Sequence, residues 1–170
     1  MKKILNILLT IIIIFFTYGI ISEITFQPLG KKELAILFPK YNEKIIRIFH
    51  KDLIGWSNKD YFDYFILQLD SVYLDSQYPI WNSEWEFVSF LNREVKEMTK
   101  WEKCPIDSVD YYKFIFEFNE ISKLEDNLFQ KEINNQNNYY CYIYVNNLEK
   151  YFLLYNPTEN KLFYIRQKGF

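Results

Sequence analysis

The chain has 170 residues, a net charge of −2 and a pI near 5.5, and 49% of its residues are hydrophobic. This length fits one domain behind a short N-terminal segment, and the hydrophobic content excludes a chain that is disordered throughout. Its Lys and Arg residues are scattered among acids, which excludes the basic surface of a nucleic-acid-binding protein.

The N-terminal segment is uncharged over residues 4–21, "ILNILLTIIIIFFTYGII". A helix needs a run of about this length, roughly 20 residues, to cross the hydrocarbon core of a membrane. Lys2 and Lys3 precede the run, and positive charge favours the cytoplasmic side. We therefore predict a transmembrane signal-anchor at residues 1–22, with the following domain extracytoplasmic, in the periplasm or at the cell surface.

The alternative for this segment is a cleavable signal peptide. Met1–Lys3 would be its basic region, residues 4–16 its apolar region and Thr17–Gly19 its cleavage site. The apolar run continues through Ile20 and Ile21 beyond that site, so the pattern favours an uncleaved anchor. Cleavage would give a secreted protein, and in both cases the domain lies outside the cytoplasm.

Residues 23–170 contain no long Gly, Ser or Pro linker, which predicts a short tether at 23–30 and a single domain at 31–170. Apolar residues recur at helical spacing from Leu34 to Phe49, and Pro39 should interrupt that helix. Residues 60–74 fit either a helix or a buried strand. Their aromatic and branched side chains favour the strand.

The clearest predicted helix begins at Ser83, which can cap it together with Glu86, and ends at Cys104. Residues 110–119 alternate between aromatic and other side chains, and this pattern predicts a strand. Residues 121–132 then predict a short amphipathic helix.

The C-terminal region predicts a three-stranded meander, with strands near Tyr139–Val145, Leu148–Tyr155 and Lys161–Gln167. Turn-forming residues separate these strands at Asn146-Asn147 and at Pro157–Asn160. A two-residue first turn would pair the end of the first strand with the start of the second, Val145 with Leu148.

Parity along these strands assigns the side chains to two faces. The first face is apolar and should be core: Cys141, Ile143, Val145, Phe152, Leu154, Phe163 and Ile165. The second face is rich in tyrosine: Tyr140, Tyr142, Tyr144, Tyr151, Leu153, Tyr155, Tyr164 and Arg166. The predicted fold is α+β, an antiparallel sheet of about four strands with helices packed mainly on the first face.

Few residues in the chain point to catalysis. The single histidine, His50, excludes an HExxH zinc site, and neither a G-x-S-x-G motif nor a Gly-rich phosphate loop occurs. We therefore assign no catalytic residue, no metal site and no cofactor. Cys104 and Cys141 could form a disulfide in an exported domain, but Cys141 falls on the core face, which favours a free thiol.

The tyrosine-rich face is the candidate binding site, because Tyr and Arg are enriched in protein-binding hot spots. Its residues are Tyr140, Tyr142, Tyr144, Tyr151, Tyr155, Tyr164 and Arg166. The alternatives are a half-buried sheet face, a face covered by the helix at 121–132, and tyrosine pairs that only stabilise the sheet. These ordinary roles of tyrosine in sheets outweigh a dedicated binding role.

Together these patterns favour a membrane-anchored, non-catalytic domain that interacts with another envelope protein. The alternative is an extracytoplasmic module that binds a small ligand or a glycan. A carboxylate-based hydrolase is a further alternative, which would require two acids converging in one cleft with at least one raised pKa.

Overall fold

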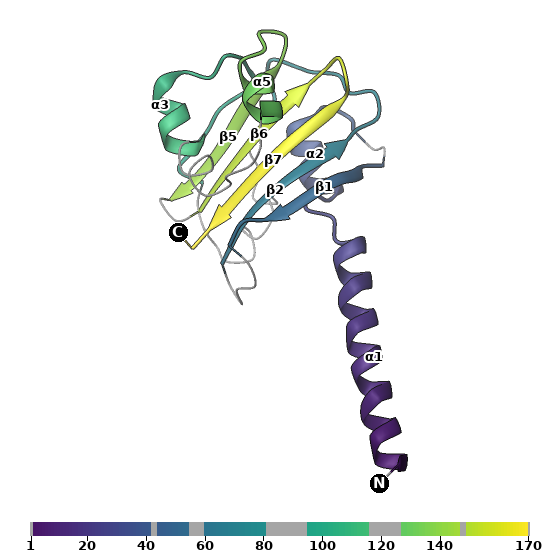
Figure 1. Cartoon of the computed structure of the whole chain (residues 1–170). Helices are drawn as coiled ribbons and strands as arrows, with labels where there is room; N and C mark the ends of the chain where they lie inside the picture. The colour runs from purple at the N-terminus through teal and green to yellow at the C-terminus, as the bar shows by residue number, and fades with distance from the viewer. Residues whose placement is uncertain are drawn as a thin grey trace.

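The computed structural model describes residues 2–41, 44–54, 60–80, 95–115, 127–146 and 149–169. Its N-terminal helix α1 (Lys2–Thr25) extends away from a domain built on one β-sheet (Figure 1). In α1 the described side chains are those of residues 7–21, and all of them are exposed. The Thr17 hydroxyl donates a 2.8 Å hydrogen bond to the carbonyl of Ile13, so this polar group is satisfied within the helix.

Length and apolarity together decide whether a helix can cross a membrane. Among the residues whose side chains the structure describes, which in α1 are residues 7–21, no helix combines enough of both to cross a membrane.

Seven strands in the described part of the chain form one antiparallel sheet. Two lie near the N-terminus, β1 (Ile46–Asp52) and β2 (Tyr61–Gln68), and two are very short, β3 (Glu97–Met98) and β4 (Glu102–Lys103). The long C-terminal strands are β5 (Tyr139–Asn146), β6 (Glu149–Asn156) and β7 (Lys161–Lys168). The strand order is β1-β2-β7-β6-β5-β3, and β4 also pairs with β5. The mixture of helices and antiparallel sheet confirms the predicted α+β class, although the sheet has more strands than expected.

The predicted meander is present, but only one of its two registers is confirmed. Between β6 and β7, Phe152 lies opposite Ile165 as predicted. Between β5 and β6, Cys141 lies opposite Leu153, not opposite Phe152. The cause is a register shift between Tyr144 and Asn146, where one extra residue enters β5 as a bulge. A shift of one residue moves every side chain of a strand to the opposite face relative to its neighbour.

Both faces of the sheet are covered, so the prediction of helices mainly on one face is wrong. One apolar cluster packs α2 (Lys31–Leu37) against side chains such as Phe65 and Leu153. The second cluster, on the other face, packs α5 (Asn127–Ile133) and the π-helix η1 (Tyr111–Ile115) against side chains such as Phe152. Figure 1 shows α5 and α2 on opposite sides of the sheet.

The predicted helix from Leu34 to Phe49 is correct only in its first part. The helix α2 ends at Leu37, and residues 46–52 form strand β1. Antiparallel pairing with β2 satisfies the backbone of β1 on its inner side, and this long-range contact selects a strand where the apolar spacing also fits a helix. The strand preferred for residues 60–74 is confirmed over Tyr61–Gln68.

Residues 95–103 are extended, not helical. Their backbone pairs with β5, as in the 3.0 Å hydrogen bond from Lys96 N to the Tyr144 carbonyl. Strands β3 and β4 thereby satisfy the outer edge of β5, which overrides the helical spacing of the apolar side chains. The start of the predicted helix, with its cap at Ser83, lies outside the described residues.

The strand predicted for residues 110–119 is also wrong where the structure describes it. A short helix, α3 (Ser108–Asp110), runs into η1 over Tyr111–Ile115. The Asp107 side chain caps this segment by accepting hydrogen bonds from the backbone N–H groups of Val109 (2.7 Å) and Asp110 (2.9 Å). This local cap favours a helical start over a strand. The remainder of the predicted strand lies outside the described residues.

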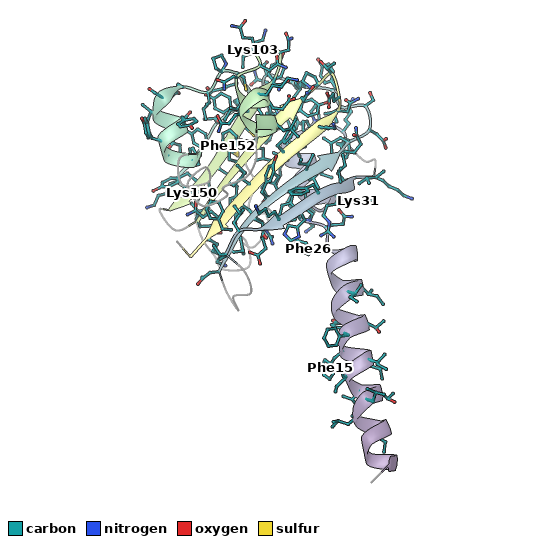
Figure 2. The ribbon with its side chains drawn as sticks, viewed as in Figure 1. Phe15, Phe26, Lys31, Lys103, Lys150 and Phe152 are labelled. Atoms are coloured by element: carbon teal, nitrogen blue, oxygen red, sulfur yellow. The ribbon has the colours of Figure 1, made fainter. Side chains whose placement is uncertain are left out.

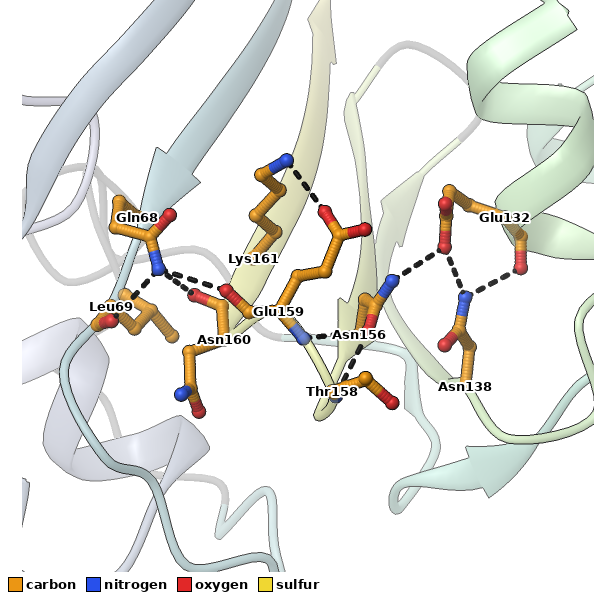
Figure 3. A network of polar contacts seen from close by, with 9 residues as sticks. All are labelled: Gln68, Leu69, Glu132, Asn138, Asn156, Thr158, Glu159, Asn160 and Lys161. Atoms are coloured by element: carbon orange, nitrogen blue, oxygen red, sulfur yellow. Dashed lines mark hydrogen bonds and ion pairs between the residues drawn. The ribbon is translucent and has the colours of Figure 1, made fainter.

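The predicted helix at 121–132 is confirmed over α5, while residues 121–126 lie outside the described residues. The Glu132 side chain connects this helix to the sheet (Figure 3). The buried Glu132 carboxylate accepts hydrogen bonds from the side-chain amides of Asn138 (2.7 Å) and Asn156 (2.8 Å). The Asn156 Oδ1 atom in turn accepts from the backbone N–H groups of Thr158 and Glu159, which orders the β6–β7 turn.

Candidate functional site

A buried ion pair joins β2 to β7. Asp63 lies directly opposite Arg166 in the register of the two strands, and the Arg166 Nε atom donates a 2.7 Å hydrogen bond to Asp63 Oδ2. Asp63 is 4% exposed and Arg166 9% exposed. A charge taken so far out of water is stable only with a partner, so each residue depends on the other.

His50 completes a three-residue polar group. Its Nε2 atom lies 2.8 Å from Asp63 Oδ1, and its ring stacks on Phe65 with centroids 4.4 Å apart and planes at 5°. Burial alone would raise the pKa of Asp63. The hydrogen bond to His50 and the charge of Arg166 outweigh burial and hold the pKa of this carboxyl below its ordinary value of 3.8.

Aromatic rings surround the Arg166 guanidinium. Its central carbon lies 4.3 Å from the ring centre of Tyr61, 5.0 Å from Phe26 and 5.4 Å from Phe65. A cation over ring faces is attracted to their negative charge, and the attraction grows when water is excluded. Because Phe26 directly follows α1, this contact connects the N-terminal helix to the sheet. We call Phe26, His50, Asp63, Phe65 and Arg166 the junction cluster.

The geometry of the junction cluster suits a structural role. A His–Asp pair also activates nucleophiles in hydrolases, where the carboxylate orients the imidazole. Here the second carboxylate oxygen of Asp63 binds Arg166 and the imidazole stacks on Phe65, so these groups are fixed among three strands and the end of α1. The cluster can thus set the orientation of α1 relative to the domain.

A second polar group lies at the opposite edge of the sheet, beside β5. The Tyr140 hydroxyl donates to Glu102 at 3.0 Å and lies 3.5 Å from Asp110. Burial, followed by the nearby charges of Asp107 and Glu102, raises the pKa of Asp110 to about 6. We call Glu102, Asp107, Asp110 and Tyr140 the acid cluster. Two of its carboxylates converge on one hydroxyl, and one of them has a raised pKa.

A lysine neighbours the acid cluster on the same edge. The Lys113 amino group forms a 2.5 Å ion pair with Glu97 and lies 4.3 Å from the ring centre of Tyr144. Glu97 also accepts a hydrogen bond from the Tyr142 hydroxyl, and burial together with this carboxylate raises the pKa of Tyr142. Across the part of the chain that the structure describes, no three His, Cys, Asp or Glu side chains are grouped so that they could hold a metal ion.

Comparison with known proteins adds no assignment to these two clusters. The chain matches no family model, no curated protein and no solved structure.

The predicted tyrosine face does not form, and this is a correction. The β5 bulge places Tyr140, Tyr142 and Tyr144 on the face that packs against α5 and η1. Tyr151, Tyr155 and Tyr164 lie in the cluster on the other face, and Arg166 projects toward that face in the junction cluster. Tyr144 is half-buried, and the other five tyrosines are at most 4% exposed. Burial raises the pKa of Tyr155 to about 12.

The two cysteines are free, so the alternative of a disulfide between Cys104 and Cys141 is wrong. Cys104 belongs to the cluster under α5, whereas Cys141 belongs to the cluster on the other side of the sheet. Burial, with a smaller effect of Glu132, raises the pKa of Cys104 to about 12, so this thiol stays protonated at neutral pH. The favoured reading of Cys141 as a buried free thiol is confirmed.

Sequence reasoning missed the junction cluster. It placed His50 near the end of a helix, whereas the residue lies in strand β1. It considered Asp63 only as one of several acids available to a hydrolase, and it placed Arg166 at the edge of a binding face. The available signal was a charged residue at an inward position of two apolar strands, "YFDYFIL" and "LFYIRQ". A buried charge of this kind requires a partner, but the sequence does not name it.

Proposed function

We propose that the chain is a single-pass membrane protein whose α+β domain binds another envelope protein outside the cytoplasm. The observation that carries the proposal is the exposure of the apolar side chains along α1. Each large apolar residue between Ile7 and Ile21 is at least 45% exposed. A soluble domain rarely presents so continuous an apolar surface to water, whereas lipid would cover it at no cost.

Further features support the anchor at residues 4–21. The helix α1 is continuous over 24 residues, and its Thr17 hydroxyl is satisfied internally, which matters in a solvent without hydrogen-bond partners. Lys2 and Lys3 favour a cytoplasmic N-terminus, and Lys31 and Lys32 oppose it only weakly because they belong to a large domain, whose charges have little effect on orientation. In Figure 2, Phe15 projects from α1 well away from the domain, while Phe26 lies where helix and domain meet.

The surface proposed for the partner lies at the far end of the domain. Val109 of α3 and Tyr112 of η1 are 72% and 67% exposed. They belong to the segment that covers the β5 side of the sheet, and β5 is remote from β1 in the strand order. Exposed tyrosine flanked by charged groups such as Lys113 is typical of binding hot spots.

Three measurements test the proposal. Carbonate extraction should leave the full chain in the membrane pellet, and N-terminal sequencing should find Met1 or Lys2, not a start near residue 20. A reporter that is active only outside the cytoplasm should be active when fused after Phe170. Recovery of the chain in the soluble fraction would refute the anchor, and a reporter active only inside would refute the topology.

The partner surface has a matched control. Affinity purification from detergent-solubilised membranes should lose the co-purifying envelope protein in Tyr112→Ala and keep it in Tyr73→Ala, which removes a tyrosine that is 72% exposed elsewhere. Equal recovery from both variants would refute a role for Tyr112.

We propose a carboxylate-based hydrolase as a second candidate, because two carboxylates of the acid cluster converge on the Tyr140 hydroxyl and one of them has a raised pKa. Asp110, with a pKa raised to about 6, could act as general acid, and Glu102 could act as its partner across Tyr140. Hydrolysis of aryl glycosides should then be lost in Asp110→Asn and in Glu102→Gln but kept in Glu159→Gln, whose carboxylate pairs with Lys161 at the surface. Absence of any turnover by the parent chain would remove this candidate.

A further inference from the structure

The first strand of the sheet presents an apolar outer edge. Strand β1 stands at the end of the strand order, so within the described residues no other strand pairs with its outer side. Ile46, Ile48 and Phe49 along this strand are 64%, 52% and 38% exposed. Proteins usually protect such edges with charges, bulges or a covering segment, because open apolar edges associate with other surfaces. A register shift between Arg47 and Phe49 accompanies the exposure of Ile48.

This edge lies next to the end of α1. Phe26 directly follows the helix, and its ring centre is 6.4 Å from that of His50 in β1 and 6.0 Å from that of Phe65 in β2. Residues 22–25 continue α1 beyond the uncharged run and add a rise of only about 6 Å. If residues 4–21 cross a bilayer, β1 must lie close to its surface. Figure 2 shows Phe26 and Lys31 near the top of α1, beside the edge of the sheet.

Basic and acidic residues are distributed unevenly along the chain, and the change falls directly after strand β1. Residues 26–52, which include β1 and α2, hold six Lys or Arg and three Asp or Glu. Residues 53–170 hold 12 Lys or Arg and 18 Asp or Glu. The segment that follows α1 is therefore basic while the remainder of the domain is acidic. Lys31 and Lys32 at the start of α2 are exposed. Basic groups beside a membrane helix are attracted to anionic lipid headgroups.

We propose that the β1 edge and the start of α2 rest on the surface of a bilayer that contains anionic lipid. We call Lys31, Lys32, Ile46, Ile48 and Phe49 the lipid-facing edge. The apolar side chains enter the boundary between headgroups and acyl chains, and the lysines contact lipid phosphates. The inference rests on the proposed anchor and adds an orientation to it: the sheet stands on β1, and the Tyr112 surface points away from the membrane.

A fluorescence-quenching experiment on the full chain tests this orientation. An environment-sensitive fluorophore is attached in turn to Ile48→Cys, to Ile13→Cys within α1 and to Tyr112→Cys at the opposite sheet edge. The native thiols Cys104 and Cys141 are buried, and the unmodified chain measures their background labelling. Each protein is reconstituted into vesicles of phosphatidylcholine and phosphatidylglycerol that carry one lipid quencher at a shallow acyl position, near the depth expected for residue 48, and another deep in the acyl region, near the depth expected for residue 13.

The expected result is strong quenching at residues 13 and 48 and none at residue 112. Quenching at residue 48 should fall in Lys31→Glu plus Lys32→Glu, in pure phosphatidylcholine, and at about 1 M salt, where the Debye length is only about 3 Å. Quenching at residue 13 should stay constant in all three. These losses at residue 48 identify headgroup charge, not the anchor alone, as the source of the contact.

Two results would overturn the proposal, and they are distinguishable. Quenching at residue 13 with no more quenching at residue 48 than at residue 112 would refute the lipid-facing edge and leave the anchor intact. Absence of quenching at residue 13 would refute the anchor and the edge together. Quenching at residue 48 that is unchanged in the lysine variant, in neutral lipid and in salt would refute the role of anionic lipid.

Discussion

Replacing Arg166 by Met should destabilise the domain, because the buried Asp63 carboxylate then loses its charged partner. The Asp63 carboxylate is 4% exposed and would keep only its contact with His50. Removing one partner of a buried ion pair typically costs 3–5 kcal/mol, and because His50 remains we expect about 3 kcal/mol. Urea unfolding of the full chain in detergent, followed by tryptophan fluorescence, measures this loss. Trp101, packed on Phe38, is a buried reporter.

Two control variants separate the electrostatic cost of breaking the ion pair from the other effects of Arg166→Met on the free energy of unfolding. Lys161→Met removes a lysine from the same strand that pairs with Glu159 at the surface, and should cost less than about 1 kcal/mol. The double variant Asp63→Leu plus Arg166→Met removes the stranded charge, so it should be less destabilised than Arg166→Met alone. A double variant as unstable as the sum of its single variants would refute the coupling.

The same variant should change the pH dependence of stability. The pKa of Asp63 is lower in the folded chain than its ordinary value of 3.8, so its charge adds stability above that value, and this stability is lost as the pH falls through 3.8 toward the folded pKa. Without Arg166, burial should dominate and raise the pKa. The stability difference between the parent and Arg166→Met should therefore be largest near pH 7 and shrink below about pH 4. A difference that does not vary with pH would refute the reasoning.

Three further predictions concern other parts of the domain. Gly169→Ala should cost about 1 kcal/mol or more in urea unfolding, because Gly169 has φ +90° and a Cβ atom would lie 2.1 Å from Asp60 Oδ1. Asn156→Ala should cost about 1–3 kcal/mol, since it removes a donor to Glu132 and the acceptor that orders the β6–β7 turn. The parent chain should lose stability as the pH rises to about 6, because the raised pKa of Asp110 shows that folding favours its neutral form. The variant Asp110→Asn should not show this loss.

Each of these has a result that contradicts it. Thr158→Ala, in the same turn, should be nearly neutral, and an equal effect of the two turn variants would argue against the Asn156 contacts. Unfolding midpoints that match the parent would contradict the strain assigned to Gly169. Parent and Asp110→Asn curves that run parallel from about pH 4 to pH 7 would contradict the raised pKa.

The sequence predicted strands and their register correctly where local patterns and long-range contacts favour the same structure. Alternation and turn residues located β5, β6 and β7, and the turn at Pro157–Asn160 set the β6–β7 register correctly. The same rules failed across the first turn, because nothing in the sequence marks Val145 as the extra residue of a bulge. The extra residue decides on which face Tyr140, Tyr142 and Tyr144 lie. Because the bulge was not predicted, the predicted binding face was wrong.

The candidate sites were harder to predict because distant segments build them. His50, Asp63 and Arg166 come from three strands, and Asp63 and Arg166 are separated by 103 positions in the chain. The apolar spacing around Ile45 and Phe49 fits a helix as well as a strand. Only pairing with β2, a long-range contact, selects the strand and brings His50 beside Asp63.

The pairing of β2 with β7 constrains the order in which the domain can be completed. Strand β2 ends at Gln68, but the neighbour that it needs begins at Lys161. During synthesis, the β1–β2 hairpin therefore waits for nearly a hundred further residues with one side unpaired. Contacts of such long sequence separation are slow to form. A chain threaded through a membrane would expose the open edge of this hairpin on the far side until β7 emerges, and that edge could meanwhile pair with other chains.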